Sequence, residues 1–297
     1  MAFMPHGIII PVVTPVDQDE RFNENVYREL LQFWSENGIH GVFPFGTTGE
    51  FYGFSDDTYR RMLDITMEER RGMAVYAGTN HITPKGVLKL ARIAEDAGVD
   101  ALSVLTPMFI SQTQDELYWF YKTVAEGTSL PIVIYNNRPK TNVHVMPETV
   151  ARLAEIPNIV AIKDSTGDMT NTEEYIRLTR HRSDFCVLMG RDTMIYAALC
   201  YGATGAIASC ANVAPKIASD IYNRYTAGDA QGALEAQFRL SMLRVASNMG
   251  SFPVVIKEGL ELLGFNVGKC LAPIRPLTEE QHEKLRLVMT QMNLLGV

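Results

Sequence analysis

Eight short apolar runs, each separated from the next by a longer stretch, are the feature of this sequence that most limits how it can fold. The runs are rich in Val and Ile and continuous rather than alternating, which is typical of parallel strands buried on both faces. They span residues 7–13, 41–45, 73–77, 101–105, 131–135, 158–163, 185–189 and 205–208. The intervening stretches include residues 23–37, 56–70, 85–97, 114–126 and 147–156, where apolar residues recur three and four positions apart, as in helices packed on a sheet. Eight strand–helix units predict a closed (β/α)8 TIM barrel rather than an open doubly wound sheet.

The last part of the 297-residue chain carries helical patterns without further strands, at residues 229–246, 252–263 and 278–294. Asp229 follows a glycine and is the expected N-cap of the first of these helices. We therefore expect residues 1–225 to form the barrel with the catalytic site, and residues 226–297 to form a C-terminal helical extension packed on it. No low-complexity linker or repeat marks a second domain, so one structural domain is predicted.

The composition excludes several classes of function. The chain has 27 Lys and Arg against 34 Asp and Glu, a formal net charge of −7, which argues against a nucleic-acid partner because such proteins need a basic stripe. No run of eighteen apolar residues occurs, so no membrane span is expected. The first residues lack the basic segment of a signal peptide. The cysteines have no CxxC spacing, which predicts buried free thiols in a cytoplasmic protein; they are Cys186, Cys200, Cys210 and Cys270.

In such a barrel the chemistry lies at the C-terminal ends of the strands. The second strand ends in a Gly-Thr-Thr-Gly-Glu turn at residues 46–50, whose backbone N–H groups suit a carboxylate. An ordinary glycine-rich turn is an equally good interpretation of this segment taken alone. The fifth strand ends in Tyr135, which by itself is better interpreted as a packed aromatic residue.

Lys163, at the end of the apolar sixth strand, is the sharpest chemical signal. A lysine among apolar walls loses solvation of its ammonium form, which lowers its pKa and frees a neutral amine to form a Schiff base with a carbonyl. A surface pair with Asp164, or a side chain that reaches out of the barrel, is the alternative. The competing lysines, Lys140 and Lys257, do not close an apolar strand.

The GTTGE, YN and IKD segments, in this order at these strand ends, together resemble the family of dihydrodipicolinate synthase and N-acetylneuraminate lyase. The resemblance spans nearly the whole chain and implies a class I, Schiff-base aldolase with a (β/α)8 barrel and a C-terminal helical extension. It implies that Lys163 forms an imine with pyruvate or another 2-oxo acid, and that Tyr135 shuttles a proton at the reacting C–C bond. It further implies that Thr47 and Thr48 hold the substrate carboxylate and that the Ile207 carbonyl lines the pyruvate pocket.

Two departures from the family pattern disfavour the lysine-biosynthetic reaction. Phe109 stands where those synthases supply a tyrosine to a neighbouring subunit's proton relay, and it has no hydroxyl group. Lys140 stands where they bind a second carboxylate through arginine, and Arg138 comes two residues early. A lysine lacks the planar fork of a guanidinium.

Other positions resemble those that hold the hydroxylated sugar tail in the sialic-acid lyase branch. They are Ser165, Gly190, Asp192 and Ser209. Thr193 replaces an acidic residue of that branch, which disfavours sialic acid itself. Arg191 either binds a substrate carboxylate or pairs with Asp192, and both interpretations stay open. With Arg138 and Lys140, it is expected at the mouth of the substrate site.

These observations predict a cytoplasmic lyase that cleaves or forms a 2-keto-3-deoxy sugar acid through a Lys163 imine, with Tyr135 and Thr47 as catalytic partners. A dehydratase or deaminase on a related 2-oxo acid is an alternative, because the same imine labilises a β-leaving group. Further alternatives are the lysine-pathway synthase, 4-hydroxy-tetrahydrodipicolinate synthase, and a catalytically silent keto-acid binder. No metal, nucleotide or organic cofactor is implied, because the imine itself accepts the electrons. The resemblance implies a homotetramer.

Overall fold

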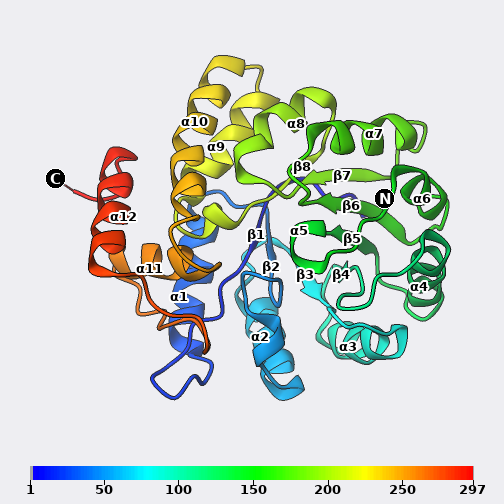
Figure 1. Ribbon diagram of the computed structural model, residues 1–297, viewed down its shortest axis with the longest axis horizontal. Coiled ribbons are helices and arrows are strands. Elements are labelled where there is room, and N and C mark those ends of the chain that lie inside the picture. The colour runs from blue at the N-terminus through cyan, green and yellow to red at the C-terminus, as the bar shows by residue number, and fades with distance from the viewer. Residues whose placement is uncertain (1–2, 297) are drawn as a thin grey trace.

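Eight parallel strands close into one barrel in the computed structural model, which describes residues 3–296 (Figure 1). Each strand pairs with its sequence neighbours, and the ring closes where Gly7 of β1 lies opposite Gly205 of β8. The strands are β1 (Gly7–Pro11), β2 (Gly41–Phe43), β3 (Ala74–Gly78), β4 (Ala101–Leu105), β5 (Ile132–Asn136), β6 (Ile159–Asp164), β7 (Cys186–Met189) and β8 (Gly205–Ile207). The predicted TIM barrel is confirmed, with strand ends shifted by one or a few residues.

The strands separate two apolar cores, one inside the barrel and one between the strands and the surrounding helices. Successive side chains of a strand point to opposite faces, so Val133 and Tyr135 belong to the inner core and Ile134 to the outer one. Tyr135 lies opposite Lys163 in the register of β5 and β6. Because side chains alternate between the two faces of a strand, Tyr135 and Lys163 both point into the barrel, at the C-terminal end of their strands.

Helices follow the strands around the barrel, and most begin at a side-chain cap. Thr113, for example, caps its helix together with Glu116 in a reciprocal pair of hydrogen bonds. The barrel helices are α1 (Glu24–Glu36), α2 (Asp56–Glu69), α3 (Pro84–Ala97), α4 (Gln114–Glu126), α5 (Arg138–Thr141), α6 (Pro147–Leu153), α7 (Met169–Thr179), α8 (Ile195–Tyr201) and α9 (Pro215–Thr226), with single 3-10 turns η1 (Phe51–Gly53), η2 (Asp192–Met194) and η3 (Ser209–Asn212). Pro139 lies in the first turn of the short helix α5, where proline is accommodated because its missing N–H is not needed for an intrahelical hydrogen bond.

Three further helices form the extension at one side of the barrel, α10 (Ala230–Ala246), α11 (Val254–Leu262) and α12 (Glu279–Gln291) (Figure 1). Asp229 accepts a hydrogen bond from the Gly232 N–H at 2.9 Å, as predicted for an N-cap. Gln237 of α10 donates to the Asp192 carbonyl at 2.7 Å and accepts from the Tyr196 N–H at 2.9 Å. These two hydrogen bonds hold the extension against η2 and the start of α8, the segment that follows β7. The predicted boundary between residues 225 and 226 stays a prediction, and residues 1, 2 and 297 lie outside the described part of the chain.

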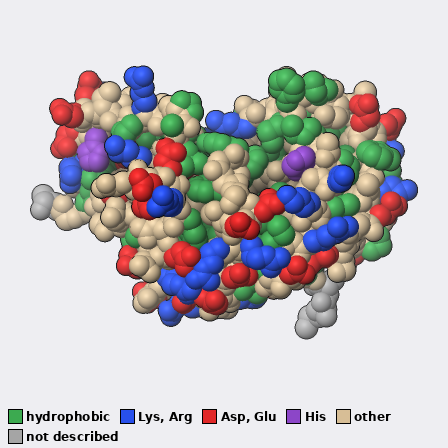
Figure 2. All heavy atoms as spheres, turned by 90° about the horizontal axis from the view of Figure 1, so that it is seen from below, with side chains coloured by type: hydrophobic (Ala, Val, Ile, Leu, Met, Phe, Trp, Pro, Cys, Tyr) green, Lys and Arg blue, Asp and Glu red, His purple; other side chains and the backbone are tan. Residues whose placement is uncertain are grey.

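The surface carries both charge signs. On the face shown in Figure 2, Lys and Arg side chains lie interspersed with Asp and Glu. No helix within residues 3–296 is long and apolar enough to cross a membrane. The prediction that all cysteines are buried is wrong for Cys200, which is exposed. It lies in α8, which turns Ile195, Ala198 and Leu199 inward and leaves Cys200 on the outer side.

Candidate active site

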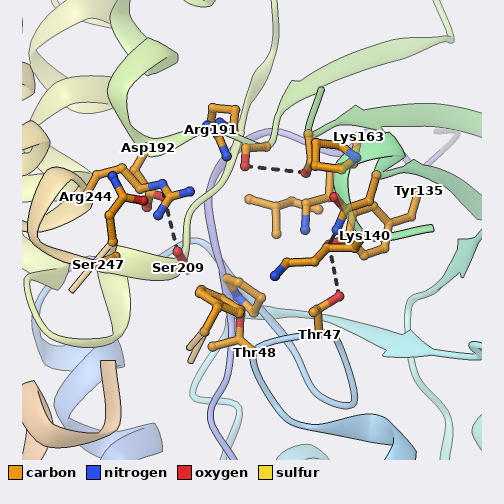
Figure 3. Close-up of a pocket in the computed structure, with 18 of the residues that line it drawn as sticks. Thr47, Thr48, Tyr135, Lys140, Lys163, Arg191, Asp192, Ser209, Arg244 and Ser247 are labelled. Carbon is orange, nitrogen blue, oxygen red and sulfur yellow. Dashed lines mark hydrogen bonds and ion pairs between the residues drawn. The ribbon is translucent and has the colours of Figure 1, made fainter. Parts of the chain in front are cut away.

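A pocket of about 410 Å³ lies at the C-terminal ends of the strands, between the barrel and the C-terminal end of α10 with the segment that follows it. In the view of Figure 3, Lys163, Tyr135 and Lys140 lie on one side, and Asp192, Ser209, Arg244 and Ser247 lie on the other. The predicted residues that line it are Thr47, Thr48, Tyr135, Lys140, Lys163, Ser165, Gly190, Arg191, Asp192, Ile207 and Ser209. Arg138 is not among them. It lines an adjacent cavity of about 500 Å³ that shares Pro139 and Lys140 with the first.

Lys163 is 3% exposed at the end of β6, which excludes the surface pair considered above. Its neighbour Asp164 is fully buried, and its carboxylate accepts hydrogen bonds from Asn171 and Thr172, each at 2.8 Å. Burial lowers the pKa of Lys163, and the nearby Tyr135 and Asp192 only partly oppose this shift. The position therefore favours a neutral amine more than an exposed lysine does.

The Tyr135 phenol is held by two side chains above the lysine. Asn137 donates a hydrogen bond to its oxygen at 2.8 Å, and the Thr47 hydroxyl lies 3.2 Å from the same atom. Lys163 Nζ lies 3.8 Å from the centre of the tyrosine ring. Burial raises the pKa of Tyr135, but the charge of Lys163 and these hydrogen bonds together lower it below its ordinary value. A phenol in this setting exchanges its proton more readily than one in an apolar core.

The turn that carries Thr47 and Thr48 has unused backbone donors. The N–H groups of Gly49 and Glu50 bond back to Gly46 and Thr47, at 3.1 and 3.3 Å. Within residues 3–296, the N–H groups of Thr47 and Thr48 donate to no protein acceptor. Free N–H groups beside a lysine form a concave site for an anion.

Glu50, the last residue of this turn, is fully buried and connects it to the extension. Its carboxylate lies 2.9 Å from Lys257 Nζ and accepts from the Leu271 N–H at 2.7 Å. Lys257, itself 1% exposed, donates its hydrogen bond to the Lys269 carbonyl at 2.8 Å. The sequence predicted neither contact, because the partners lie in distant parts of the chain.

Position 190, directly after β7, has no room for a side chain and is occupied by glycine. Its N–H donates to the Asp164 carbonyl at 2.7 Å. A Cβ atom there would lie 2.1 Å from the Ser165 hydroxyl oxygen and 2.7 Å from that same carbonyl. Glycine thus lets β6 and β7 approach closely, and Ser165 occupies the space at the pocket wall.

Asp192 is buried on the side of the pocket opposite Lys163, where three groups interact with its carboxylate. Ser209 donates to it at 3.1 Å, the Cys210 N–H donates at 2.8 Å, and Arg244 Nε lies 3.7 Å away. Arg191 makes no ion pair with it within 4.0 Å in the described chain. Of the two interpretations of Arg191, pairing with Asp192 is therefore wrong, and Arg244 takes that place.

Sequence reasoning missed the part of the pocket that lies outside the strand ends. Arg244 belongs to the last turn of α10, and the segment after it crosses the mouth of the barrel. The missed lining residues are Asn137, Arg244, Ser247, Asn248, Gly250, Ser251 and Phe252, with Pro11 and Pro139. Lys140 Nζ lies 5.8 Å from the centre of the Phe252 ring, across the mouth. Only Asn137 had a detectable signal, as a polar residue directly after the fifth strand.

These groups suit carbonyl chemistry. A desolvated amine, a phenol with perturbed acidity and a turn with free backbone donors line one pocket. Within residues 3–296, no group of three or more His, Cys, Asp or Glu side chains is placed to hold a metal ion.

Comparisons with known proteins agree with this geometry. The model of the "Dihydrodipicolinate synthetase family" matches residues 4–292. A protein of Methanothrix thermoacetophila named 4-hydroxy-tetrahydrodipicolinate synthase is 34% identical over 290 residues, covering 98% of each chain. The crystal structure of dihydrodipicolinate synthase from Thermotoga maritima superposes with a TM-score of 0.95 at 33% identity, over 99% of this chain and 100% of that one. A chloride-inhibited dihydrodipicolinate synthase from Acinetobacter baumannii, complexed with pyruvate, has a TM-score of 0.94 at 30% identity, over 98% and 99% of the two chains.

Proposed function

Since the chain belongs to the dihydrodipicolinate synthetase family, we propose that Lys163 is its Schiff-base lysine and that it acts on a 2-keto-3-deoxy sugar acid. Members of this family are class I lyases that work through a lysine Schiff base. The observation that carries the assignment is the pairing of Lys163 with Tyr135, opposite each other on adjacent strands and 3.8 Å apart from Nζ to the ring centre.

The chemistry follows from the positions of these groups. The neutral amine of Lys163 attacks the C2 carbonyl of the 2-oxo acid, and loss of water gives the protonated imine. The free N–H groups of Thr47 and Thr48 hold the substrate carboxylate. Tyr135 gives its phenol proton to the water that leaves. In cleavage, the resulting phenolate takes the proton of the C4 hydroxyl while the C3–C4 bond breaks, the tail leaves as an aldehyde, and the electrons of the broken bond move into the imine to give an enamine. Protonation of the enamine at C3 and hydrolysis release pyruvate and regenerate the lysine.

The wall beyond Lys163 supports a hydroxylated substrate tail. Ser165, Ser209, Ser247 and Ser251 line the pocket. The hydroxyl groups of the first three donate to the Gly190 carbonyl, the Asp192 carboxylate and the Leu243 carbonyl, and their oxygens can still accept hydrogen bonds from substrate hydroxyl groups. The pocket volume of about 410 Å³ far exceeds what a three-carbon acid fills and falls within the range of small-molecule sites. A polyol tail uses both properties.

Borohydride trapping tests the role of Lys163. Reduction in the presence of pyruvate is expected to leave an adduct on Lys163, detected by mass spectrometry of a digest. The expected substrate class is tested by coupled release of pyruvate from a panel of 2-keto-3-deoxy acids. Binding of pyruvate without any adduct would instead support a catalytically silent keto-acid binder.

The second candidate is 4-hydroxy-tetrahydrodipicolinate synthase, which the names of the similar proteins favour. Pyruvate consumption that depends on aspartate semialdehyde, with no pyruvate release from the sugar-acid panel, identifies this activity. Release of water or ammonia from a panel acid without C–C cleavage identifies the dehydratase or deaminase. The homotetramer and the cytoplasmic location stay predictions. Light scattering at several protein concentrations measures the molar mass of the assembly and so tests the homotetramer.

A further inference from the structure

Two arginines lie in the half of the pocket away from Tyr135 and Thr47 (Figure 3). Arg191 follows β7, and Arg244 stands in the last turn of α10. They come from separate parts of the fold, one from the barrel and one from the extension. The hydrogen bonds of Gln237 between α10 and the loop after β7 fix the two parts against each other.

Only one of these two charges has a carboxylate partner. Asp192 lies 3.7 Å from Arg244 and gives its remaining acceptor capacity to Ser209 and to the Cys210 N–H. Arg191 has no carboxylate within 4.0 Å and no hydrogen-bond acceptor in the described chain, and its Nε is buried. Its guanidinium group instead lies against Gly167, where a Cβ atom would be 3.1 Å from Nε.

The charge of Arg191 is only partly compensated in this half-buried position. Burial lowers the pKa of Arg191, the positive charge of Arg244 lowers it further, and the Asp192 carboxylate opposes these effects only in part. Cations that lose solvation are ordinarily paired, so a half-buried guanidinium group near a second one, without a hydrogen-bond acceptor, favours an anionic ligand. The guanidinium group offers the planar donor fork that matches carboxylate or phosphate oxygens.

The composition of the pocket lining points the same way. The chain as a whole is acidic, at −7, yet Lys140, Lys163, Arg191 and Arg244 face this pocket with Asp192 as the one acidic side chain among its lining residues in the described chain. Lys163 and the Thr47–Thr48 turn account for the 2-oxo acid end. The far wall keeps an excess of positive charge for a second group.

We propose that Arg191, supported by Arg244, forms a second anion subsite that binds a carboxylate or phosphate group at the far end of the substrate tail. This inference rests on the proposed function, because it requires the 2-oxo acid end of the substrate to lie at Lys163. It narrows the substrate class to sugar acids with an anion at each end. The serine hydroxyl groups of the pocket lining then contact the tail.

Competition against pyruvate trapping tests the subsite without knowledge of the substrate. Borohydride trapping of pyruvate on Lys163 is measured with gluconate, glucarate or 6-phosphogluconate as competitor. None of these acids has a 2-oxo group, and only the last two carry a second anion. In the wild type, glucarate or 6-phosphogluconate is expected to inhibit at a concentration at least tenfold lower than gluconate, and the better of the two identifies carboxylate or phosphate.

Arg191→Gln is expected to remove most of this tenfold preference, and Arg191→Lys, which keeps the charge, to retain part of it. Arg180→Gln is the matched control, because Arg180 is an exposed arginine at the far end of α7. Arg244 is the poorer target, since its removal leaves Asp192 without its cation. The trapped adduct itself reports that each variant is folded.

The outcomes separate the two proposals. Trapping with equal inhibition by all three acids, or a preference that survives in Arg191→Gln, overturns the subsite and leaves the role of Lys163 intact. Absence of trapping in the wild type overturns the proposed function, and the subsite with it.

Discussion

Lys163 and Lys257 are both almost completely buried, at 3% and 1% exposure, yet their surroundings differ in one decisive respect. Lys257 has the Glu50 carboxylate at 2.9 Å and the Lys269 carbonyl at 2.8 Å. Lys163 has aromatic rings instead, with Nζ 3.8 Å from the centre of Tyr135 and 5.3 Å from that of Phe43. Burial alone therefore does not distinguish a reactive lysine from a structural one.

The difference between the two regions lies in how each compensates a desolvated charge. A buried ammonium group with a carboxylate and a carbonyl acceptor is satisfied as a cation and holds two segments together. A buried ammonium group with aromatic neighbours gains less, so its pKa falls and the amine becomes available for attack. We therefore expect the ion pair of Lys257 to serve stability, and the surroundings of Lys163 favour the chemistry proposed for it.

Lys163→Met removes the amine proposed to form the imine and is expected to have the largest effect of any single substitution. Methionine is similar in length but cannot form an imine, so turnover is expected to fall by more than about a thousandfold. The borohydride adduct with pyruvate should also disappear. Lys257→Met is the matched control, and its adduct should still map to Lys163. An adduct that persists in Lys163→Met would assign the chemistry to another lysine.

Lys257→Met is expected to have the largest effect on stability. It leaves the buried Glu50 carboxylate without its cation, which typically lowers the free energy of unfolding by about 3–5 kcal/mol. Urea denaturation followed by circular dichroism measures the loss. Addition of Glu50→Gln to this variant removes the unpaired charge and should restore part of the stability. No recovery in the double variant would mean that lost packing, rather than the charge, sets the loss.

Tyr135→Phe removes the phenol hydroxyl group next to Lys163 and leaves the aromatic ring in place. Loss of the proton donor and acceptor is expected to reduce turnover by about a hundredfold or more. Tyr135 raises the pKa of Lys163, so its removal lowers that pKa further. The neutral amine then persists to lower pH, and the acid limb of the pH profile for pyruvate trapping should move to lower pH. A shift to higher pH would contradict this arrangement.

The smallest expected effect is a gain of stability in Lys163→Met. Removal of a buried amine without a carboxylate partner should raise the free energy of unfolding by about 1 kcal/mol at neutral pH. The folded-state pKa of Lys163 is lowered from 10.5, so the unfolded chain binds more protons below that value. Wild-type stability therefore increases with pH up to about 10.5, and the advantage of the variant should shrink over the same range. Urea denaturation of the wild type and of Lys163→Met at pH 7 and pH 10 measures how the difference in free energy of unfolding changes with pH.

The sequence predicted the barrel because its signal is local and repeated. Each apolar run defines a buried strand by itself, and the count of eight defines closure. The same local pattern singled out Lys163, because it ends such a run and parallel strands place their ends on one face, whereas Tyr135 taken alone was better interpreted as a packed aromatic residue. The resemblance then assigned roles to these residues, and the structure places Lys163, Tyr135, Thr47 and Thr48 around one pocket.

The other half of the pocket could not be predicted, because no local pattern states where the end of a packed helix lies. In the sequence, Arg244 is one more polar residue of a helical segment, and the hydrogen bond between Glu50 and Leu271 joins residues 221 positions apart. Even at Arg191 the sequence left two interpretations open. The preference of Asp192 for Arg244 decided between them, and that preference depends on how α10 docks.

The contacts of Glu50 with Lys257 and Leu271 also determine when the pocket can form during synthesis of the chain. At about 5–20 residues per second, the ribosome reaches Leu271 roughly 10–40 s after Glu50. Until then, all eight strands can be present while the Glu50 carboxylate still faces water and the turn before it lacks its final support. The keto-acid site proposed at Lys163 is therefore completed only in the last stage of translation.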